Sequence, residues 1–334
     1  MSVFQQSKVM ALLRSQWLKR LAQAAFLLAL AYFIIHAFIS GWSSAQRFPW
    51  RISWPALIVA YLFFIAQELS FAAIWRAILR RLDVHLPLFT AEYIYLTAEL
   101  VRYIPGNVWH VASRVVYAER EGSPKTKTFI SMTVELATKI AGAILFFMLT
   151  LPFWPRTNQL GAFSAYIRSI AAVLLIVGLP ILLFGLRPQT MNNIFLYAGK
   201  LLKREIALVT MRFQDIVPVL LMWLASWLTV GIGFALALYA IGFTIKSWEI
   251  ILVYMGIYAI GWAIGFLSFI TPSGLGFREG TIALLLFASG AAPSLVIGAA
   301  AAVAAARVLP MLAEFTCVGA VQALKKFGFS TRNA

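Results

Sequence analysis

Residues 102–114 read RYIPGNVWHVASR and residues 271–279 read TPSGLGFRE, and these two segments break a chain that is otherwise apolar enough to lie in lipid. Proline and glycine interrupt helices, and backbone is left open inside a bilayer only where protein or a water-filled cavity surrounds it. Arginines stand in both segments, at Arg102, Arg114 and Arg278. Two breaks flanked by cations therefore predict one polar site inside a membrane protein.

Composition places the chain among integral membrane proteins. Hydrophobic residues make up 62% of its 334 residues, compared with about 45–50% in soluble domains. Lysine and arginine number 28 against 12 acidic residues, and these cations stand at the ends of apolar runs, where they face lipid headgroups. We expect one membrane domain over residues 1–334 and no nucleic-acid partner. A basic cavity for an anionic substrate is compatible with the same charge balance.

Metal and disulfide chemistry is not expected. The single cysteine, Cys317, lies in an apolar run, and the three histidines, His36, His85 and His110, are far apart without the spacing of metal ligands. We therefore expect no metal site and no cofactor.

Six apolar runs are long enough to cross a bilayer, which takes about 20 helical residues. The first follows basic residues as in a signal peptide, but it is longer than an apolar signal region of about 7–15 residues, and we interpret it as a retained anchor. Segments 88–121 and 249–290 each contain an apolar stretch, a Pro/Gly break and a second helical stretch, which predicts two broken, re-entrant hairpins. The six runs are 21–41, 54–75, 127–151, 168–186, 214–241 and 294–321.

The loop cations predict the orientation. If both hairpins return to the face they enter, nearly all loop cations share one side, which is the cytoplasm by the positive-inside rule. We therefore predict a multi-pass protein of the cytoplasmic (inner) membrane with both termini in the cytoplasm. Residues 187–213 mix basic and apolar positions, which is typical of an interfacial helix on anionic lipid.

The order of elements repeats along the chain. Residues 21–151 and 168–321 each read span, span, broken hairpin, span, and because three spans is an odd number the second copy must be inverted. Inverted repeats with broken helices near the midplane are typical of transporters. The predicted fold is an all-α polytopic membrane protein with six spanning helices and two broken hairpins in two inverted repeats. Short sequence echoes support it: IPGN (104–107) and GSPKT (122–126), then TPSG (271–274) and AAPSL (291–295).

Eleven ionisable residues lie within or against the apolar helices. A charge at the bilayer centre costs about 2.5–3.5 kcal/mol on insertion scales, so each needs a partner, water or a ligand. Internal pairing predicts Glu135 with Lys139 at i and i+4, Arg102 or Arg114 with Glu279, and Arg307 with Glu135. The full set is Glu68, Glu92, Glu99, Arg102, Arg114, Glu135, Lys139, Arg278, Glu279, Arg307 and Glu314.

The functional interpretation assigns the cations to a lipid headgroup. Arginine matches the geometry of a phosphate, the helix after each break adds free N–H groups at its N-terminus, and glycine lets the backbone approach a ligand. The predicted counter-charges or proton carriers are Glu135, Lys139 and Glu279. The predicted substrate-binding residues are Arg102, Gly106, Asn107, Trp109, Arg114, Gly274, Gly276, Arg278 and Arg307.

The sequence resembles the flippase-like membrane domain of lysylphosphatidylglycerol synthases and its stand-alone relatives. The resemblance lies in both breaks, in the helix ending EREGSP at 119–124, in Glu135 of the next span and in Arg307 of the last span. The more specific motif is P-x-G-x-G-x-R-E, which runs from Pro272 to Glu279. The resemblance covers nearly the whole chain and implies lipid translocation. Relatives with synthase activity carry a soluble transferase domain after the membrane part; this sequence ends at Ala334, so synthase activity is not expected.

The sequence thus predicts a flippase, not an enzyme, that moves an anionic lipid, either a phospholipid or a polyprenyl-phosphate carrier. The alternative is a membrane enzyme, a glycosyltransferase or lipid phosphatase acting on a polyprenyl-phosphate carrier, although the only aspartates, Asp83 and Asp215, are far apart. A structural subunit of an envelope-assembly complex is a third interpretation. Anionic membrane lipids are the expected partners, and the sequence leaves open a homo-oligomer or envelope-biosynthesis partners.

Overall fold

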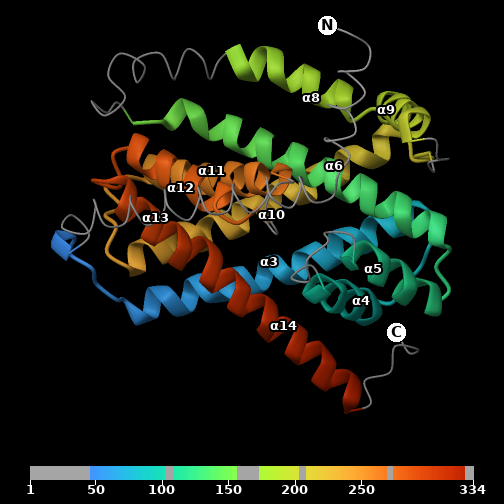
Figure 1. Ribbon diagram of the computed structural model, residues 1–334, viewed down its shortest axis with the longest axis horizontal. Helices are drawn as coiled ribbons and strands as arrows, with labels where there is room; N and C mark the ends of the chain where they lie inside the picture. Colours follow the sequence, from blue (N-terminus) through green and yellow to red (C-terminus); the bar gives the residue numbers. More distant parts are fainter. Residues whose placement is uncertain (1–45, 102–108, 156–172, 203–207, 269–273, 328–334) are drawn as a thin grey trace, which may run out of the picture.

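The computed structural model describes residues 46–101, 109–155, 173–202, 208–268 and 274–327. Every regular element in these ranges is a helix, and the helices pack as one bundle (Figure 1). The predicted span 21–41 and the predicted site residues Arg102, Gly106 and Asn107 lie outside the described residues.

Five helices of the described part are long and apolar enough to cross a membrane. Four of them confirm the spans predicted at 54–75, 127–151, 214–241 and 294–321. The fifth, α11, forms the first arm of a hairpin and is longer than a re-entrant arm needs to be. The five are α3 (Trp54–Arg81), α6 (Lys125–Thr150) with the 3₁₀ turn η2 (Leu151–Phe153), α10 (Phe213–Ala240), α11 (Trp248–Leu267), and the run α13 (Leu295–Val303), η6 (Ala304–Val308) and α14 (Leu309–Lys326).

Two π-helical turns precede prolines. The turn η4 (Leu174–Gly178) leads into α8 (Leu179–Gly185) and Pro180, and η6 leads into α14 and Pro310. Proline has no N–H to donate to the carbonyl four residues earlier, so a wider turn relieves the clash. Together η4 and α8 form a short apolar helix within the predicted span 168–186. Arg307 lies in the second π turn.

Two helical hairpins carry the breaks. The first consists of α4 (Leu88–Leu100) and α5 (Trp109–Arg120), and the second of α11 and α12 (Phe277–Ala288). Helices of 12 or 13 residues are about 18–20 Å long, shorter than the roughly 30 Å hydrocarbon core, whereas the 20 residues of α11 reach about 30 Å. Each second arm is followed two residues later by a glycine with positive φ, Gly122 at 86° and Gly290 at 75°, a conformation that ends helices.

Loops far apart in the sequence meet at the two ends of the bundle. At one end the start of α3 lies against the end of α10, where Ser53 N donates to Ala240 O at 2.8 Å. The end of α6 reaches the start of α11 there, with the rings of Phe153 and Trp248 5.3 Å apart. Both hairpins return to the end at which they begin, the first to the right and the second to the left in Figure 1.

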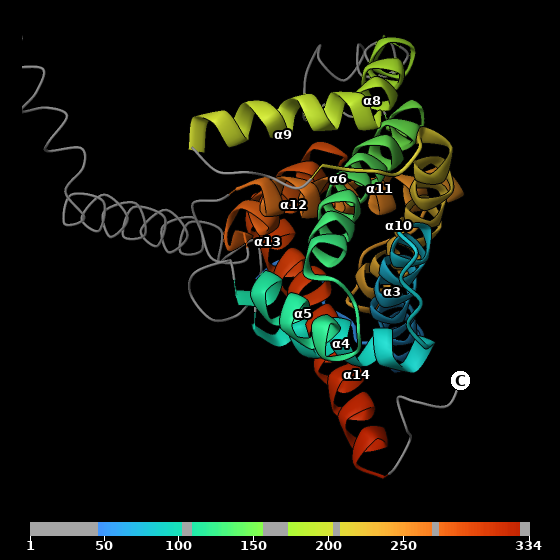
Figure 2. The ribbon, with the colours of Figure 1, turned by 90° about the vertical axis from the view of Figure 1, so that its right-hand side faces the viewer.

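The described loop cations are distributed unevenly between these ends. The left end in Figure 1 holds the segment before α3 and the loop between α10 and α11, which contain Arg47, Arg51 and Lys246. The right end also has α9 (Pro188–Leu202), within the predicted interfacial segment; it projects sideways in Figure 2. This asymmetry agrees with the loop assignment that underlies the predicted orientation. The right end in Figure 1 holds the ends of α3, α5, α8 and α14 and the starts of α6 and α10, and these segments contain Arg76, Arg80, Arg81, Arg120, Lys125, Lys127, Arg187, Arg212, Lys325 and Lys326.

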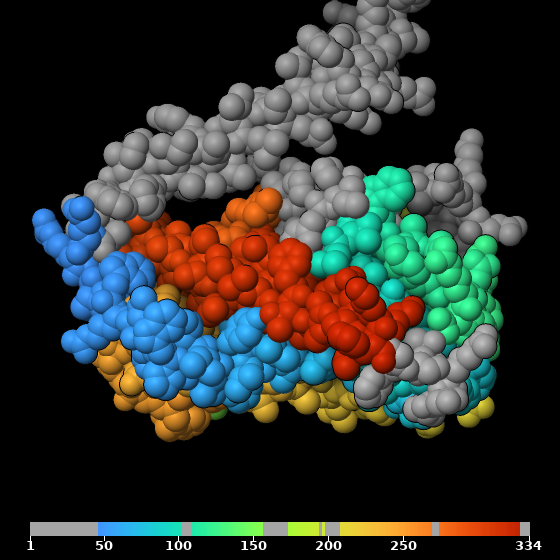
Figure 3. Space-filling model, turned by 90° about the horizontal axis from the view of Figure 1, so that it is seen from below, coloured from blue at the N-terminus to red at the C-terminus, as the bar shows by residue number. Residues whose placement is uncertain are grey.

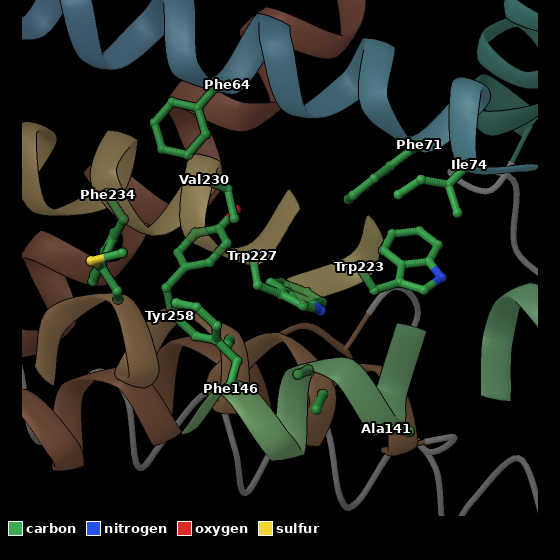
Figure 4. Packing of buried hydrophobic residues seen from close by; sticks show 14 of the residues in the cluster. Phe64, Phe71, Ile74, Ala141, Phe146, Trp223, Trp227, Val230, Phe234 and Tyr258 are labelled. Carbon is green, nitrogen blue, oxygen red and sulfur yellow. The ribbon is translucent and has the colours of Figure 1, made fainter. Parts of the chain in front are cut away.

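The core lies between α3, α6, α10 and α11. Large rings fill it, including Phe64, Trp223, Trp227 and Tyr258, each less than 2% exposed (Figure 4). The α13–α14 run lies beside α3 (Figure 3), where the Tyr61 hydroxyl lies 2.6 Å from Thr316 Oγ1 and donates to Leu312 O at 3.2 Å. Interhelical hydrogen bonds of this kind help membrane helices associate, because apolar burial drives them together little in lipid.

Candidate functional site

Arg114 is the centre of a buried ion cluster in the first half of the chain. It is 3% exposed; its Nη1 donates to Glu135 Oε2 at 2.6 Å and its Nη2 to Glu99 Oε1 at 2.5 Å. Tyr95 donates to Glu135 Oε1 at 2.8 Å, and the guanidinium lies 4.0 Å from the Tyr95 ring centroid and 5.4 Å from that of Trp75. The cluster thus joins α3, α4, α5 and α6, and both terminal nitrogens of Arg114 bind protein carboxylates.

Glu279 and Arg307 form the corresponding pair in the second half. Arg307 Nε donates to Glu279 Oε1 at 2.7 Å, and the two side chains are 17% and 12% exposed. The other oxygen of Glu279 accepts a hydrogen bond from Gly276 N at 2.8 Å, which caps the start of α12. One carboxylate therefore fixes both the end of the second break and the contact of α12 with η6.

The predicted pairings across the two halves are wrong for these residues. Arg114 pairs with Glu99 and Glu135, not with Glu279, and Arg307 pairs with Glu279, whereas the oxygens of Glu135 accept hydrogen bonds from Tyr95 and Arg114. The physical reason is connectivity, because the second arm of each hairpin packs directly on the span that follows it. Partners close in the chain meet without any contact between the halves.

Close packing fixes α12 against α11 beside the second break. A Cβ at Gly265 would stand 2.7 Å from the Arg278 Cβ, and one at Gly261 would stand 2.5 Å from Ile282 Cγ1. Gly274 has φ +67°, and a Cβ there would lie 2.3 Å from Gly265 O. Glycine is therefore required at Gly274 for both its conformation and its contact. These contacts hold the backbone of Arg278 in place.

Arg278 has a hydrogen-bonding edge to which no described residue binds. Its guanidinium lies 5.0 Å from the Tyr258 ring centroid. Nε and Nη2 are buried, and neither has a hydrogen-bond acceptor among the described residues. These two nitrogens lie on the same edge of the planar group and present parallel N–H donors, the geometry that binds two oxygens of a carboxylate or phosphate. Arg278 therefore differs from Arg114, whose terminal nitrogens bind protein carboxylates.

Lys139 lies in an aromatic cage. Its Nζ is 3.5 Å from the ring centroid of Phe71, 4.7 Å from that of Trp262 and 5.1 Å from that of Trp223, and the residue is 8% exposed. The rings come from α3, α11 and α10, so cation–π attraction joins three helices to α6. The ion pair of Lys139 with Glu135 stays a prediction.

Acidic groups also lie in the interior. Glu68 and Glu314 are 6% and 1% exposed, and their carboxyls, with that of Glu92, lie close enough to Cys317 to interact with it electrostatically. These residues belong to α3, α14 and α4. The polar interior is therefore mixed in charge rather than uniformly basic. Among the described residues, no three His, Cys, Asp or Glu side chains group closely enough to hold a metal ion.

The sequence-predicted residues thus fall into separate groups. Arg114 and Glu135 join the first cluster, and Gly276, Glu279 and Arg307 join the second. Trp109, one of the predicted substrate-binding residues, begins α5 and is 51% exposed.

Sequence reasoning missed Gln67 and Tyr258, which lie near Arg278. The Tyr258 hydroxyl is close to both the Gln67 and Arg278 side chains. The sequence contains a signal that Gln67 is a buried polar residue. It lies on one helix face with Phe64, Glu68 and Phe71, at the spacing of a buried face, where polar residues are unexpected.

Comparison with known proteins gives one finding. A family profile described as the lysylphosphatidylglycerol synthase TM region matches residues 17–313. A search of curated proteins finds no match. The profile covers both hairpins, each ion cluster and four of the five spanning helices in full, and it ends at Ala313, near the start of α14. The chain therefore belongs to the family of the lysylphosphatidylglycerol synthase TM region.

Proposed function

We propose that this membrane protein is a lipid flippase that moves an anionic lipid across the cytoplasmic membrane, and that Arg278 binds the phosphate of its headgroup. The observation that carries the proposal is the free edge of Arg278, where Nε and Nη2 are buried without an acceptor among the described residues. Family membership supports a lipid-related role in the membrane.

The energetics favour a ligand at this edge. Leaving a buried donor unsatisfied costs about 1–3 kcal/mol, and more for a charged group. A phosphate provides two oxygens in the geometry of the fork and one negative charge or more, so it satisfies both donors of Arg278 and neutralises its charge. Arg114 and Arg307 already bind carboxylates. We therefore assign them to holding the helices, and Arg278 to the ligand.

We further propose that the two halves are inverted repeats that alternate access to this site. Three features support it. The helices α3 and α10 run in opposite directions, and the hairpins that follow them return to opposite ends of the bundle (Figure 1). In each half an ion pair joins the second hairpin arm to the next span, Arg114 to Glu135 and Glu279 to Arg307. Such paired hairpins between spans suit a carrier with two gates.

Leaflet exchange in proteoliposomes tests the proposal. Protein is reconstituted into phosphatidylcholine vesicles with a trace of fluorescent phosphatidylglycerol, and dithionite reduces the fluorophore in the outer leaflet. We expect wild-type protein to make nearly all of the fluorophore reducible. Arg278→Gln is expected to slow exchange about 10- to 100-fold, the equivalent of the 1.5–3 kcal/mol of hydrogen bonds to a charged group.

Arg120→Gln is the matched control, because Arg120 is exposed at the end of α5 and loses the same charge. It should exchange lipid like the wild type, and both variants should unfold at the wild-type temperature in detergent. Vesicles with wild-type protein that behave like empty vesicles would contradict the proposal. Recovery of a chemically altered lipid after the assay would favour the membrane enzyme instead.

A further inference from the structure

Gln67 is a buried amide on the face of α3 that points to the centre of the bundle. Phe64, Gln67, Glu68 and Phe71 are 0%, 3%, 6% and 5% exposed, and they follow the i, i+3, i+4, i+7 spacing of one helix face. Phe64 packs against Tyr258 of α11, with ring centroids 6.2 Å apart. Gln67 thus lies one turn further along the surface that faces Tyr258.

The side-chain carbonyl oxygen of this amide has no hydrogen-bond partner among the residues that the structure describes. Gln67 Oε1 is buried and accepts no hydrogen bond within the described part of the chain. Buried side-chain polar atoms are nearly always paired, so an unpaired one calls for a specific explanation. Packing by the aliphatic part of the side chain does not explain why a glutamine stands here, because methionine or leucine would fill the same space without leaving a polar atom unpaired.

Gln67 and Arg278 approach the same hydroxyl. Both side chains lie close to the hydroxyl of Tyr258, a residue that is 1% exposed. In the described part of the chain, two donors on one edge of Arg278 and the acceptor oxygen of Gln67 have no hydrogen-bond partner. The donors of Arg278 and the acceptor of Gln67 are therefore close enough together for one small ligand group to bind both.

We propose that Gln67 determines the headgroup specificity of the flippase by accepting a hydrogen bond from the headgroup while Arg278 binds its phosphate. This inference rests on the proposed function and names its substrate class. The ligand is an anionic phosphodiester whose headgroup carries a hydroxyl donor next to the phosphate. Such a ligand satisfies both the donors and the acceptor of the site, whereas a phosphodiester capped by a methyl group, or a polyprenyl monophosphate, leaves Gln67 unpaired.

Two fluorescent lipids separate this role from phosphate binding. Phosphatidylglycerol and phosphatidylmethanol carry the same single charge and the same phosphodiester, but only the first has headgroup hydroxyls. We expect wild-type protein to exchange phosphatidylglycerol roughly tenfold faster than phosphatidylmethanol, the effect of one buried hydrogen bond. In Gln67→Met the ratio should fall to about one, with phosphatidylmethanol exchanged as fast as before.

Controls keep the outcomes distinct. Gln214→Met makes the same change at an exposed position of α10 and should keep the wild-type ratio. Gln67→Glu provides a second readout, because a carboxylate near Arg278 competes for its free edge and should slow exchange of both lipids. An unchanged ratio in Gln67→Met, or an equal loss for both lipids in that variant, would overturn the inference. Absence of exchange of either lipid by the wild type would refute the proposed function itself.

Discussion

Arg114 Nη1 donates a hydrogen bond to Glu135 Oε2 at 2.6 Å, and this contact joins the second arm of the first hairpin to the span that follows it. The second half contains the same connection with the charges exchanged, because Glu279 on α12 accepts from Arg307 on η6 at 2.7 Å. Each ion pair therefore fixes the second hairpin arm to the next span of the same half of the chain. Movement of one hairpin relative to the other half does not require either ion pair to break.

Removal of Arg114 should destabilise the protein strongly. Arg114→Met leaves Glu99 and Glu135 buried without their cation, and breaking a buried pair in this way costs about 3–5 kcal/mol. We expect a clear fall in the thermal unfolding temperature in detergent. Arg120→Met, which removes an exposed arginine from the same helix, should change it little. Equal unfolding temperatures for the two variants would show that the cluster does not hold the helices.

Alanine at Gly274 should disturb the second hairpin. The new Cβ would meet Gly265 O at 2.3 Å, and φ +67° is unfavourable for alanine. We expect a loss of stability of at least about 1–3 kcal/mol, as for other strained or overpacked positions. Gly280→Ala is the matched control, since nothing lies within 4 Å of its Cβ in helix α12. It should be neutral or raise stability by up to about 1 kcal/mol. A larger loss of stability in Gly280→Ala than in Gly274→Ala would contradict this packing.

The cage around Lys139 should show energetic coupling. Phe71→Leu keeps an apolar side chain but removes the ring that lies 3.5 Å from Nζ. In the Lys139→Met background, Phe71→Leu should lower the free energy of unfolding by less, because no cation is left to lose its contact with the ring. A double-mutant cycle of unfolding free energies should give a coupling of about 0.5–2 kcal/mol. Additive effects of the two substitutions would mean that the contact contributes nothing.

Single cysteines should reveal the orientation. Cys317 is buried, and Cys317→Ala provides the background for labelling with an impermeant maleimide. Cysteines at the exposed positions Thr126 and Gln189 should react only from the cytoplasm, and one at exposed Ser247 only from the other side. Labelling of Thr126→Cys in intact cells from outside would reverse the orientation that the loop cations predict.

Hydropathy predicted most of the spanning helices. Stretches such as 54–75 and 214–241 have no alternative to a spanning helix, since about 20 apolar residues match the bilayer thickness. Their ends were placed less well, because α3 continues to Arg81 past Arg76, with Arg80 and Arg81 in its last turn. Long cationic side chains reach the headgroups from inside a helix, so these arginines do not end it.

The second hairpin was predicted as two arms around a break, and α11 and α12 confirm the two helices. The length of α11 was less apparent, because Gly256, Gly261 and Gly265 weaken a helical pattern read from sequence. In the fold these glycines permit close contact, as with Thr150 at Gly256 and Arg278 at Gly265. Tertiary packing therefore decides their conformation.

The candidate site was predictable as a set of residues but not as a set of contacts. Spacing placed Arg278 and Glu279 beside the second break, and the preference of buried charges for partners predicted ion pairs. It did not identify the partners, since Arg114 reaches Glu99 and Glu135 only because α4, α5 and α6 pack together. Gln67 was missed because it carries no charge, although its position on an otherwise buried face of α3 is a signal for an interior polar group.

The central claim is that the free edge of Arg278 binds a lipid phosphate. A structure determined with phosphatidylglycerol in a lipid nanodisc tests it most directly. We predict a phosphate with two oxygens within about 3 Å of Arg278 Nε and Nη2, the distance of charge-assisted hydrogen bonds. A lipid-filled structure in which those two nitrogens bind a protein carboxylate or carbonyl, and no phosphate lies near them, would contradict it.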